Sequence, residues 1–182
     1  WENLNSKKRE TTFFVPTLVM IPMRKILSAY EELRMADRNF LIKEDYLKIR
    51  DLLFAIGHYL RLFKIKISPT IVLGVEISSL VKEELRSMRG YSSAVDGLLN
   101  YRFSKRIKEQ KTKLYLVIDY FENQVVDKGW NAGFNKFYPD IPTIGYRGYI
   151  PSLQYLCSYP SKIEYNSGIL PATISVIGKG FI

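Results

Sequence analysis

Three adjacent polar residues, Glu122, Asn123 and Gln124, have types and spacing suited to chemistry. They follow an apolar run over residues 114–118 that is typical of a buried strand. In open α/β sheets, ligands bind in the crevice beyond the carboxyl ends of the strands. A carboxylate there can act as a general base, and neighbouring amides can fix hydroxyl groups by hydrogen bonds. The segment therefore predicts a site that binds a hydroxylated substrate, with Glu122 as the general base.

Glu122 also has a structural interpretation. Desolvation at a partly apolar strand end would raise its pKa and suit it to proton transfer. A carboxylate just before a helix would instead stabilise the helix dipole. Glu122 alone does not separate the two interpretations, and the adjacent amides favour the functional one. Asp119, still within the expected strand, is interpreted as structural.

Further substrate-binding candidates follow along the chain. On a helix expected at residues 126–138, Lys128, Asn131 and Asn135 share one face, and the first two are predicted to contact substrate. Gly129 and Gly133 interrupt the same helix at a cost of about 1 kcal/mol each relative to alanine. This cost indicates close approach of a backbone or a ligand, or packing against the sheet.

A glycine-flanked segment at residues 145–149 follows the next expected strand. Arg147 there could reach a phosphate or a carboxylate, with Tyr146 and Tyr149 beside it, although a turn with a surface arginine has the same pattern. Lys179 lies between two glycines, as in a loop that contacts phosphate. The P-loop and the G-x-G-x-x-G dinucleotide fingerprints are both absent from the sequence.

Cysteine, histidine and charge content narrow the function classes. With one cysteine and one histidine, the sequence excludes an intrachain disulfide and a multi-cysteine metal site, and no tightly bound cofactor is expected. Residues 1–113 hold 22 Lys+Arg and 13 Asp+Glu, whereas residues 114–182 hold 5 of each. The basic half indicates an anionic partner or simply a solvated basic surface. Nucleic acid is not favoured, because the basic helix near residues 102–108 lacks interleaved base-stacking aromatics.

The order of elements predicts the fold. Apolar runs predict strands at residues 69–77, 114–118, 142–145, 163–164 and 173–177. Residues 12–21 are expected to form either a strand or a buried irregular segment. Helices are expected at residues 22–34, 44–63 and 126–138, and after the serines near 78 and 92. The helix at 44–63 carries an apolar face made of Ile49, Leu52, Leu53, Ile56, Leu60 and Phe63. The alternation predicts an α/β, Rossmann-like, mostly parallel sheet with helices on both faces.

Three segments of the sequence resemble a known family. Residues 121–131 (FENQVVDKGWN), 144–150 (IGYRGYI) and 176–180 (VIGKG), together with Glu164, resemble bacterial surface-carbohydrate glycosyltransferases of the capsule and lipopolysaccharide type, in the GT-B class. The resemblance is tightest over residues 114–182. Arg147 departs from the family pattern, which often has glutamine or histidine in that segment, so its role stays open.

The resemblance implies one half of a two-domain GT-B enzyme. Residues 1–11 would be a loose N-terminal segment, residues 12–175 the acceptor-side domain, and residues 176–182 the start of a crossover to a donor domain. Such an enzyme moves a sugar from a nucleotide-sugar donor to a surface polysaccharide or a lipid-diphosphate acceptor. Glu122 would be the base, Asn123 and Gln124 would orient the sugar, and residues 145–149 would line the cleft. The fragment alone would be inactive.

The expected location and the alternative functions follow from the same features. The resemblance implies a cytoplasmic protein. Its basic half would then meet an anionic glycan, a lipid-diphosphate acceptor or, in peripheral contact, the anionic inner membrane face. A non-enzymatic module that binds a glycan or a partner protein is the alternative function. A nucleic-acid-binding domain built on the basic helices is a third possibility, and a steep salt dependence of binding would identify it.

Overall fold

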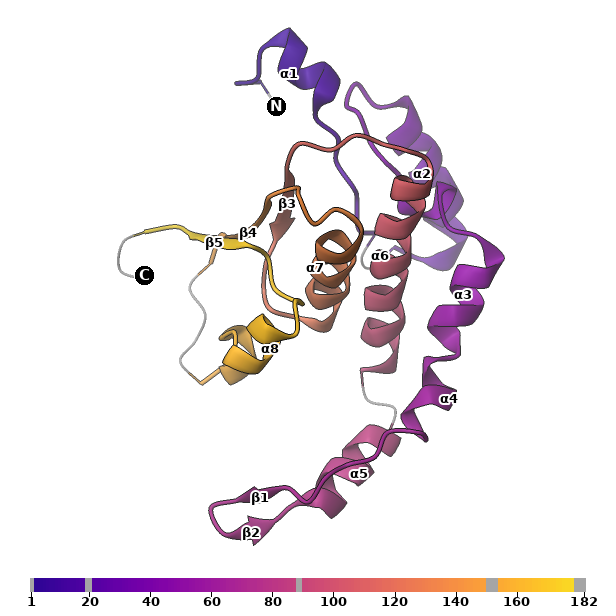
Figure 1. Cartoon of the computed structure of the whole chain (residues 1–182). Coiled ribbons are helices and arrows are strands. Elements are labelled where there is room, and N and C mark those ends of the chain that lie inside the picture. The colour runs from indigo at the N-terminus through magenta and orange to yellow at the C-terminus, as the bar shows by residue number, and fades with distance from the viewer. Residues whose placement is uncertain (1, 19–20, 88–89, 150–153, 179–182) are drawn as a thin grey trace. The chain divides into compact units, whose positions relative to one another are not determined.

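The computed structural model describes residues 2–18, 21–87, 90–149 and 154–178, and its elements are drawn in Figure 1. The chain divides into two compact units, Trp1–Tyr46 and Leu47–Ile182. The domain boundaries expected from the sequence, at residues 12 and 176, stay a prediction. Among the described residues, no helix combines the length and the apolar character needed to cross a membrane.

The first unit is helical with little sheet. It contains α1 (Ser6–Thr11), α2 (Ile26–Met35) and two 3-10 turns, η1 (Met23–Lys25) and η2 (Lys43–Asp45). The Asn5 side chain caps α1 by accepting a hydrogen bond from the backbone N–H of Lys8. Of the two alternatives expected for residues 12–21, the described part is an irregular segment and not a strand, because only Phe14 pairs there, in a single bridge to Phe40.

The helix predicted at residues 44–63 is broken into shorter pieces. These are η2, α3 (Ile49–Ile56) and α4 (His58–Leu62), and Gly57 separates α3 from α4. The strand predicted at residues 69–77 is instead a hairpin of two short antiparallel strands, β1 (Ile71–Val72) and β2 (Val75–Glu76). Leu73 and Gly74 both have positive φ at its turn. The chain reverses there, so the apolar run that predicted a single strand forms two strands. Helix α5 (Ser78–Arg86) follows.

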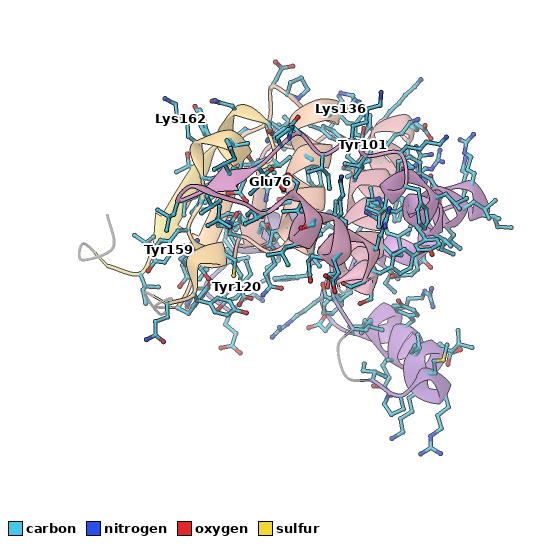
Figure 2. All side chains as sticks on the ribbon, turned by 90° about the horizontal axis from the view of Figure 1, so that it is seen from below. Glu76, Tyr101, Tyr120, Lys136, Tyr159 and Lys162 are labelled. Atoms are coloured by element: carbon cyan, nitrogen blue, oxygen red, sulfur yellow. The ribbon has the colours of Figure 1, made fainter. Side chains whose placement is uncertain are left out.

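A tight helix pair forms the centre of the second unit. Helix α6 (Tyr91–Glu109) packs along α7 (Val125–Phe137), and Figure 1 shows α7 between α6 and the sheet. A Cβ atom added to Gly129 would lie 1.9 Å from the carbonyl oxygen of Gly97. The glycines of α7 therefore allow close approach of another backbone, which is one of the explanations that the sequence suggested, and the backbone is that of helix α6. Nearby, the Lys136 ammonium group lies 5.7 Å from the ring centroid of Tyr101 (Figure 2).

Helix α3 is held to α6 by a buried ion network. Asp51 is fully buried, and its carboxylate accepts hydrogen bonds from Arg102 at 2.5 Å and from Arg106 at 2.6 and 2.7 Å. Arg106 also pairs with Glu109 at 2.5 Å. The arginines of α6 that the sequence presented as a basic surface are therefore engaged inside the fold.

A three-stranded parallel sheet confirms the α/β class. Strands β3 (Val117–Tyr120), β4 (Thr143–Arg147) and β5 (Thr173–Val176) pair in the order β3-β4-β5. The predicted strand at residues 163–164 is wrong, because α8 (Lys162–Asn166) occupies it, and a short 3-10 turn, η3 (Leu156–Ser158), precedes it. Ser161 caps α8 through its side chain, which explains the helix.

The two faces of this sheet differ in burial. The face toward α7 carries Val117, Thr143 and Arg147, all buried. The opposite face carries Ile118 and Tyr120, which are 61% and 54% exposed. Within the described residues, helices therefore cover one face and not both, contrary to the sequence-based expectation.

Candidate functional site

The turn after β3 places the three predicted polar residues. The chain leaves the strand through Phe121, which is fully buried, and reverses at Asn123 with a φ of 61°. The backbone N–H groups of Glu122 and Gln124 donate to Asp127 Oδ2 at 2.9 and 3.0 Å. Asp127 is thus the carboxylate that caps α7.

This arrangement leaves the Glu122 carboxylate available for another role. Glu122 is only half-buried, and its Oε2 accepts a hydrogen bond from the side-chain amide of Gln124. The structural role that the sequence allowed for Glu122, the carboxylate at the N-terminus of the helix, therefore belongs to Asp127. Glu122 and Gln124 do lie together at the carboxyl end of β3, as the sequence predicted.

A second carboxyl group near this edge has strongly perturbed electrostatics. Burial and the nearby Asp127 carboxylate raise the pKa of Asp119 to about 7. Asn131, which is fully buried, donates to Asp119 Oδ2 at 3.2 Å and to the Asp127 carbonyl at 2.9 Å. Burial also raises the pKa of Asp127, against the backbone hydrogen bonds that lower it. A carboxyl group that titrates near neutrality is suited to proton transfer.

Asn123 and Arg147 hold the segment that contains η3 against the sheet. Asn123 Nδ2 donates to the carbonyl of Cys157 at 2.8 Å, and Arg147 donates to the carbonyl of Ser158. Both side chains are buried, and the Arg147 guanidinium lies 5.6 Å from the ring centroid of Phe121. Arg147 is therefore neither a surface arginine nor a group presented at an open edge in this conformation.

The polar face of α7 is divided among different partners. Lys128 Nζ lies 2.5 Å from Glu164 Oε1. Burial alone would raise the pKa of Glu164, but hydrogen bonds from Lys128 and Ser161 hold it at about 2. Asn135 donates to the carbonyls of Gly168 and Leu170 at 2.9 and 2.8 Å. The face thus fixes the chain between α8 and β5, while Asn131 turns toward Asp119.

Three tyrosines gather on the open face where the strands end. Tyr120 of β3 and Tyr146 of β4 are register partners, with ring centroids 6.3 Å apart. Tyr149 approaches Tyr120 at 6.4 Å. Gly148 lies against these rings, since an added Cβ would come within 2.9 Å of Tyr146 and 3.2 Å of Tyr120. We call Tyr120, Tyr146 and Tyr149 the tyrosine cluster; Figure 2 labels Tyr120.

Asp119, Asp127 and Tyr120 are the residues of this edge that sequence reasoning did not assign to the site. Asp127 had a detectable signal, because it stands three residues after the N-cap Gln124, the spacing of a capping box. Glutamine is an unusual N-cap residue, which hides the pattern. Lys179 lies outside the described residues.

Two hollows of about 440 and 110 Å³ lie on other parts of the second unit. One is lined by residues of α5, and the other by residues between α4 and α5, including Tyr59, Phe63 and Leu85. Neither of these two hollows is lined by a candidate site residue, and the described site residues lie along the carboxyl edge of the sheet. Among the described residues, no group of three or more acidic, histidine or cysteine side chains could hold a metal ion.

No family model, curated protein or solved structure matches the chain.

Proposed function

We propose that this chain is the acceptor-side, Rossmann-like half of a GT-B glycosyltransferase. The proposal is supported by one observation above the others, the tyrosine cluster at the strand ends that also carry Glu122. Aromatic rings offer broad apolar faces with a polar tip, and they suit the C–H faces and hydroxyl groups of a sugar. Glu122, which is half-buried, is the second residue after the end of β3, so it belongs to the same edge of the sheet as the tyrosine cluster.

The proposed reaction is an inverting transfer. A hydroxyl oxygen of the acceptor sugar attacks the anomeric carbon of a nucleotide-sugar, and the bond from that carbon to the diphosphate oxygen breaks. The hydroxyl proton passes to Glu122, and the nucleoside diphosphate leaves with the bonding electron pair. Gln124 holds the carboxylate by its hydrogen bond to Oε2. The nucleotide-sugar is a substrate of the whole enzyme and not a bound cofactor.

A transfer assay on the full-length gene product tests the role of Glu122. The probes are UDP-glucose, UDP-galactose, UDP-N-acetylglucosamine and GDP-mannose with lipid-linked and polysaccharide acceptors, and the readout is release of the nucleoside diphosphate. Glu122→Gln should lower kcat by about 100-fold or more with an unchanged circular dichroism spectrum. Unchanged turnover in this variant would remove Glu122 as the base.

Asp119→Asn is the matched control for that assay. It replaces a carboxyl group one residue before the end of β3, on the face that packs against α7. If Asp119 is the base, this variant loses turnover and Glu122→Gln does not. If both variants retain turnover, neither carboxyl group accepts the proton and the proposed mechanism is wrong.

A non-enzymatic glycan-binding module is the second candidate. It is favoured by the burial of Arg147, because this guanidinium donates to the Ser158 carbonyl and is not presented to a phosphate group. The mass of the native gene product separates the two functions. A product about twice this length supports the two-domain enzyme, whereas a product that ends near residue 182 favours the binding module.

A further inference from the structure

The apolar face of α3 and α4 is exposed in the second unit. Six side chains make up this α3–α4 apolar face, and each is between 43% and 77% exposed: Ile49, Leu52, Leu53, Ile56, Leu60 and Phe63. An amphipathic helix in a globular protein normally turns such a face toward the core. Here the core-facing side of α3 is a different one, and it carries Asp51 and Ala55, both fully buried.

The ion network between α3 and α6 fixes this orientation. Asp51 reaches Arg102 and Arg106 at 2.5 and 2.6 Å, and the three side chains are 15% exposed or less. Rotating α3 to bury its apolar face would remove Asp51 from both arginines and leave their charges buried without it. Breaking such a pair costs several kcal/mol. The apolar face therefore stays outward while α3 stays docked on α6.

The chain around this face is strongly basic. Residues 47–67 contain five Lys+Arg residues, and their one acidic residue is Asp51, whose charge is buried and paired. Lys48, Arg50, Lys64 and Lys66 are exposed, at the two ends of the α3–α4 segment. Apolar side chains along the middle and cations at both ends give the pattern of a helix that lies in a membrane interface.

We propose that the α3–α4 apolar face binds the surface of an anionic lipid bilayer. Its leucine, isoleucine and phenylalanine side chains enter the boundary between headgroups and acyl chains, and the flanking lysines and Arg50 contact the lipid phosphates. A second copy of the chain fits less well, because an isologous contact would bring the same cations together from both copies. The proposal does not depend on the sugar-binding role of the sheet edge.

Vesicle co-sedimentation of the full chain tests this surface. The expected result is binding to phosphatidylcholine vesicles that contain about 30% phosphatidylglycerol, and weak binding to pure phosphatidylcholine. Leu60→Ser should lower the partition coefficient by about tenfold, because the leucine no longer enters the acyl boundary. The control is Ile163→Ser on α8, which changes a side chain that is 78% exposed and should leave binding unchanged.

A charge-reversal variant tests the electrostatic part. Lys64→Glu with Lys66→Glu should lower binding to the anionic vesicles by at least about tenfold, and added salt should have a weaker effect on what remains. No binding of the wild-type chain to anionic vesicles would overturn the proposal, as would equal binding by Leu60→Ser and wild type. A wild-type dimer that Leu60→Ser converts to a monomer, with no vesicle binding, would assign the face to self-association instead.

Discussion

Two aspartates of this chain, the buried Asp51 and the half-buried Asp119, have opposite electrostatic environments. Asp51 is surrounded by arginines, whose hydrogen bonds hold its pKa well below the usual range even though burial alone would raise it. Asp119 is half-buried near Asp127 and accepts a hydrogen bond from the Asn131 amide, and partial burial together with the Asp127 charge raises its pKa to about 7. The Asp51 carboxylate therefore stabilises the fold in its ionised form, whereas the environment of Asp119 favours the protonated form.

We expect the stability of the protein to fall as the pH rises from about 4 through about 7. The pKa of Asp119 is raised from 3.8 to about 7 by folding, so the native state binds this proton more tightly than the unfolded chain does. Its contribution is complete below the unfolded pKa and is lost as the pH rises through the native pKa. Between these values the slope is on the order of 1.4 kcal/mol per pH unit.

Urea unfolding at pH 5 and pH 8 measures this effect. Asp119→Asn should flatten the dependence and be more stable than the wild type at pH 8, since it removes a buried negative charge. Asp140→Asn, on the exposed turn after α7, is the control and should keep the wild-type slope. An Asp119→Asn variant that keeps the wild-type slope would contradict the assignment to Asp119.

The Asp51 network should contribute far more to stability than an exposed ion pair of equal geometry. Asp51→Asn leaves Arg106 buried with part of its charge uncompensated, and we expect a loss of about 3 kcal/mol or more in the free energy of unfolding. Arg34 and Asp45 form a 2.6 Å pair in which both side chains are nearly half exposed. Asp45→Asn should therefore cost less than about 1 kcal/mol. Similar losses in the two variants by chemical denaturation would argue against the network.

At the scale of elements, the crossing of α6 and α7 determines where the site residues lie. Gly97, Gly129 and Gly133 allow the two backbones to approach, and α7 in turn presents Asn131 and Asp127 to the end of β3. The contacts of α7 with the end of β3 thus position the residues at the carboxyl edge of the sheet. A change at this crossing should affect both stability and the geometry of the edge.

Gly129→Ala should destabilise the protein by several kcal/mol. Helix propensity alone predicts the opposite sign, a gain of about 1 kcal/mol. The structure predicts a loss, because the new Cβ would lie 1.9 Å from the Gly97 carbonyl oxygen and backbone cannot give way as a side chain can. Thermal unfolding followed by circular dichroism decides between them. Lys136→Ala, exposed on the same helix, removes a cation–π contact with Tyr101 and should cost no more than about 1 kcal/mol.

Local patterns in the sequence predicted the second half of the fold better than the first. The helix expected at residues 126–138 and the strand at 173–177 lie within one residue of α7 and β5. These elements have strong local signals, a proline stop and a short β-branched run. The exposure of the α3–α4 apolar face was not predictable from the sequence, because helical spacing identifies an apolar face but not the side of the helix that packs. Packing was decided by Asp51 and its two arginines, which are more than 50 residues away in sequence.

The candidate site was predictable only in its position along the chain. The strand end at residues 120–124 followed from the apolar run, and Glu122 and Gln124 do meet there. The burial of Arg147 depends on its hydrogen bond to the carbonyl of Ser158, and no local sequence pattern predicts that contact. The raised pKa of Asp119 likewise depends on its distance in space to Asp127 and Asn131.

At the scale of the whole molecule, the second unit presents two apolar surfaces of different kinds. The open face of the sheet carries aromatic rings with hydroxyl groups near an acidic residue, which suits a neutral or hydroxylated ligand. The α3–α4 apolar face carries aliphatic side chains between lysines and Arg50, which suits an anionic lipid surface. A protein that transfers sugars to lipid-linked acceptors would use both.

Binding to a microarray of bacterial surface polysaccharides and oligosaccharides tests the central claim most directly, because it probes the sheet edge without requiring turnover. The account predicts that the wild-type chain binds a defined subset of glycans. It also predicts that Tyr146→Ala, which removes a ring from the tyrosine cluster, abolishes that binding with an unchanged circular dichroism spectrum. Tyr115→Ala, which changes a tyrosine that is 84% exposed and precedes β3, should bind as wild type. An array without binding, or equal binding by wild type and Tyr146→Ala, would contradict the claim that this edge receives a sugar.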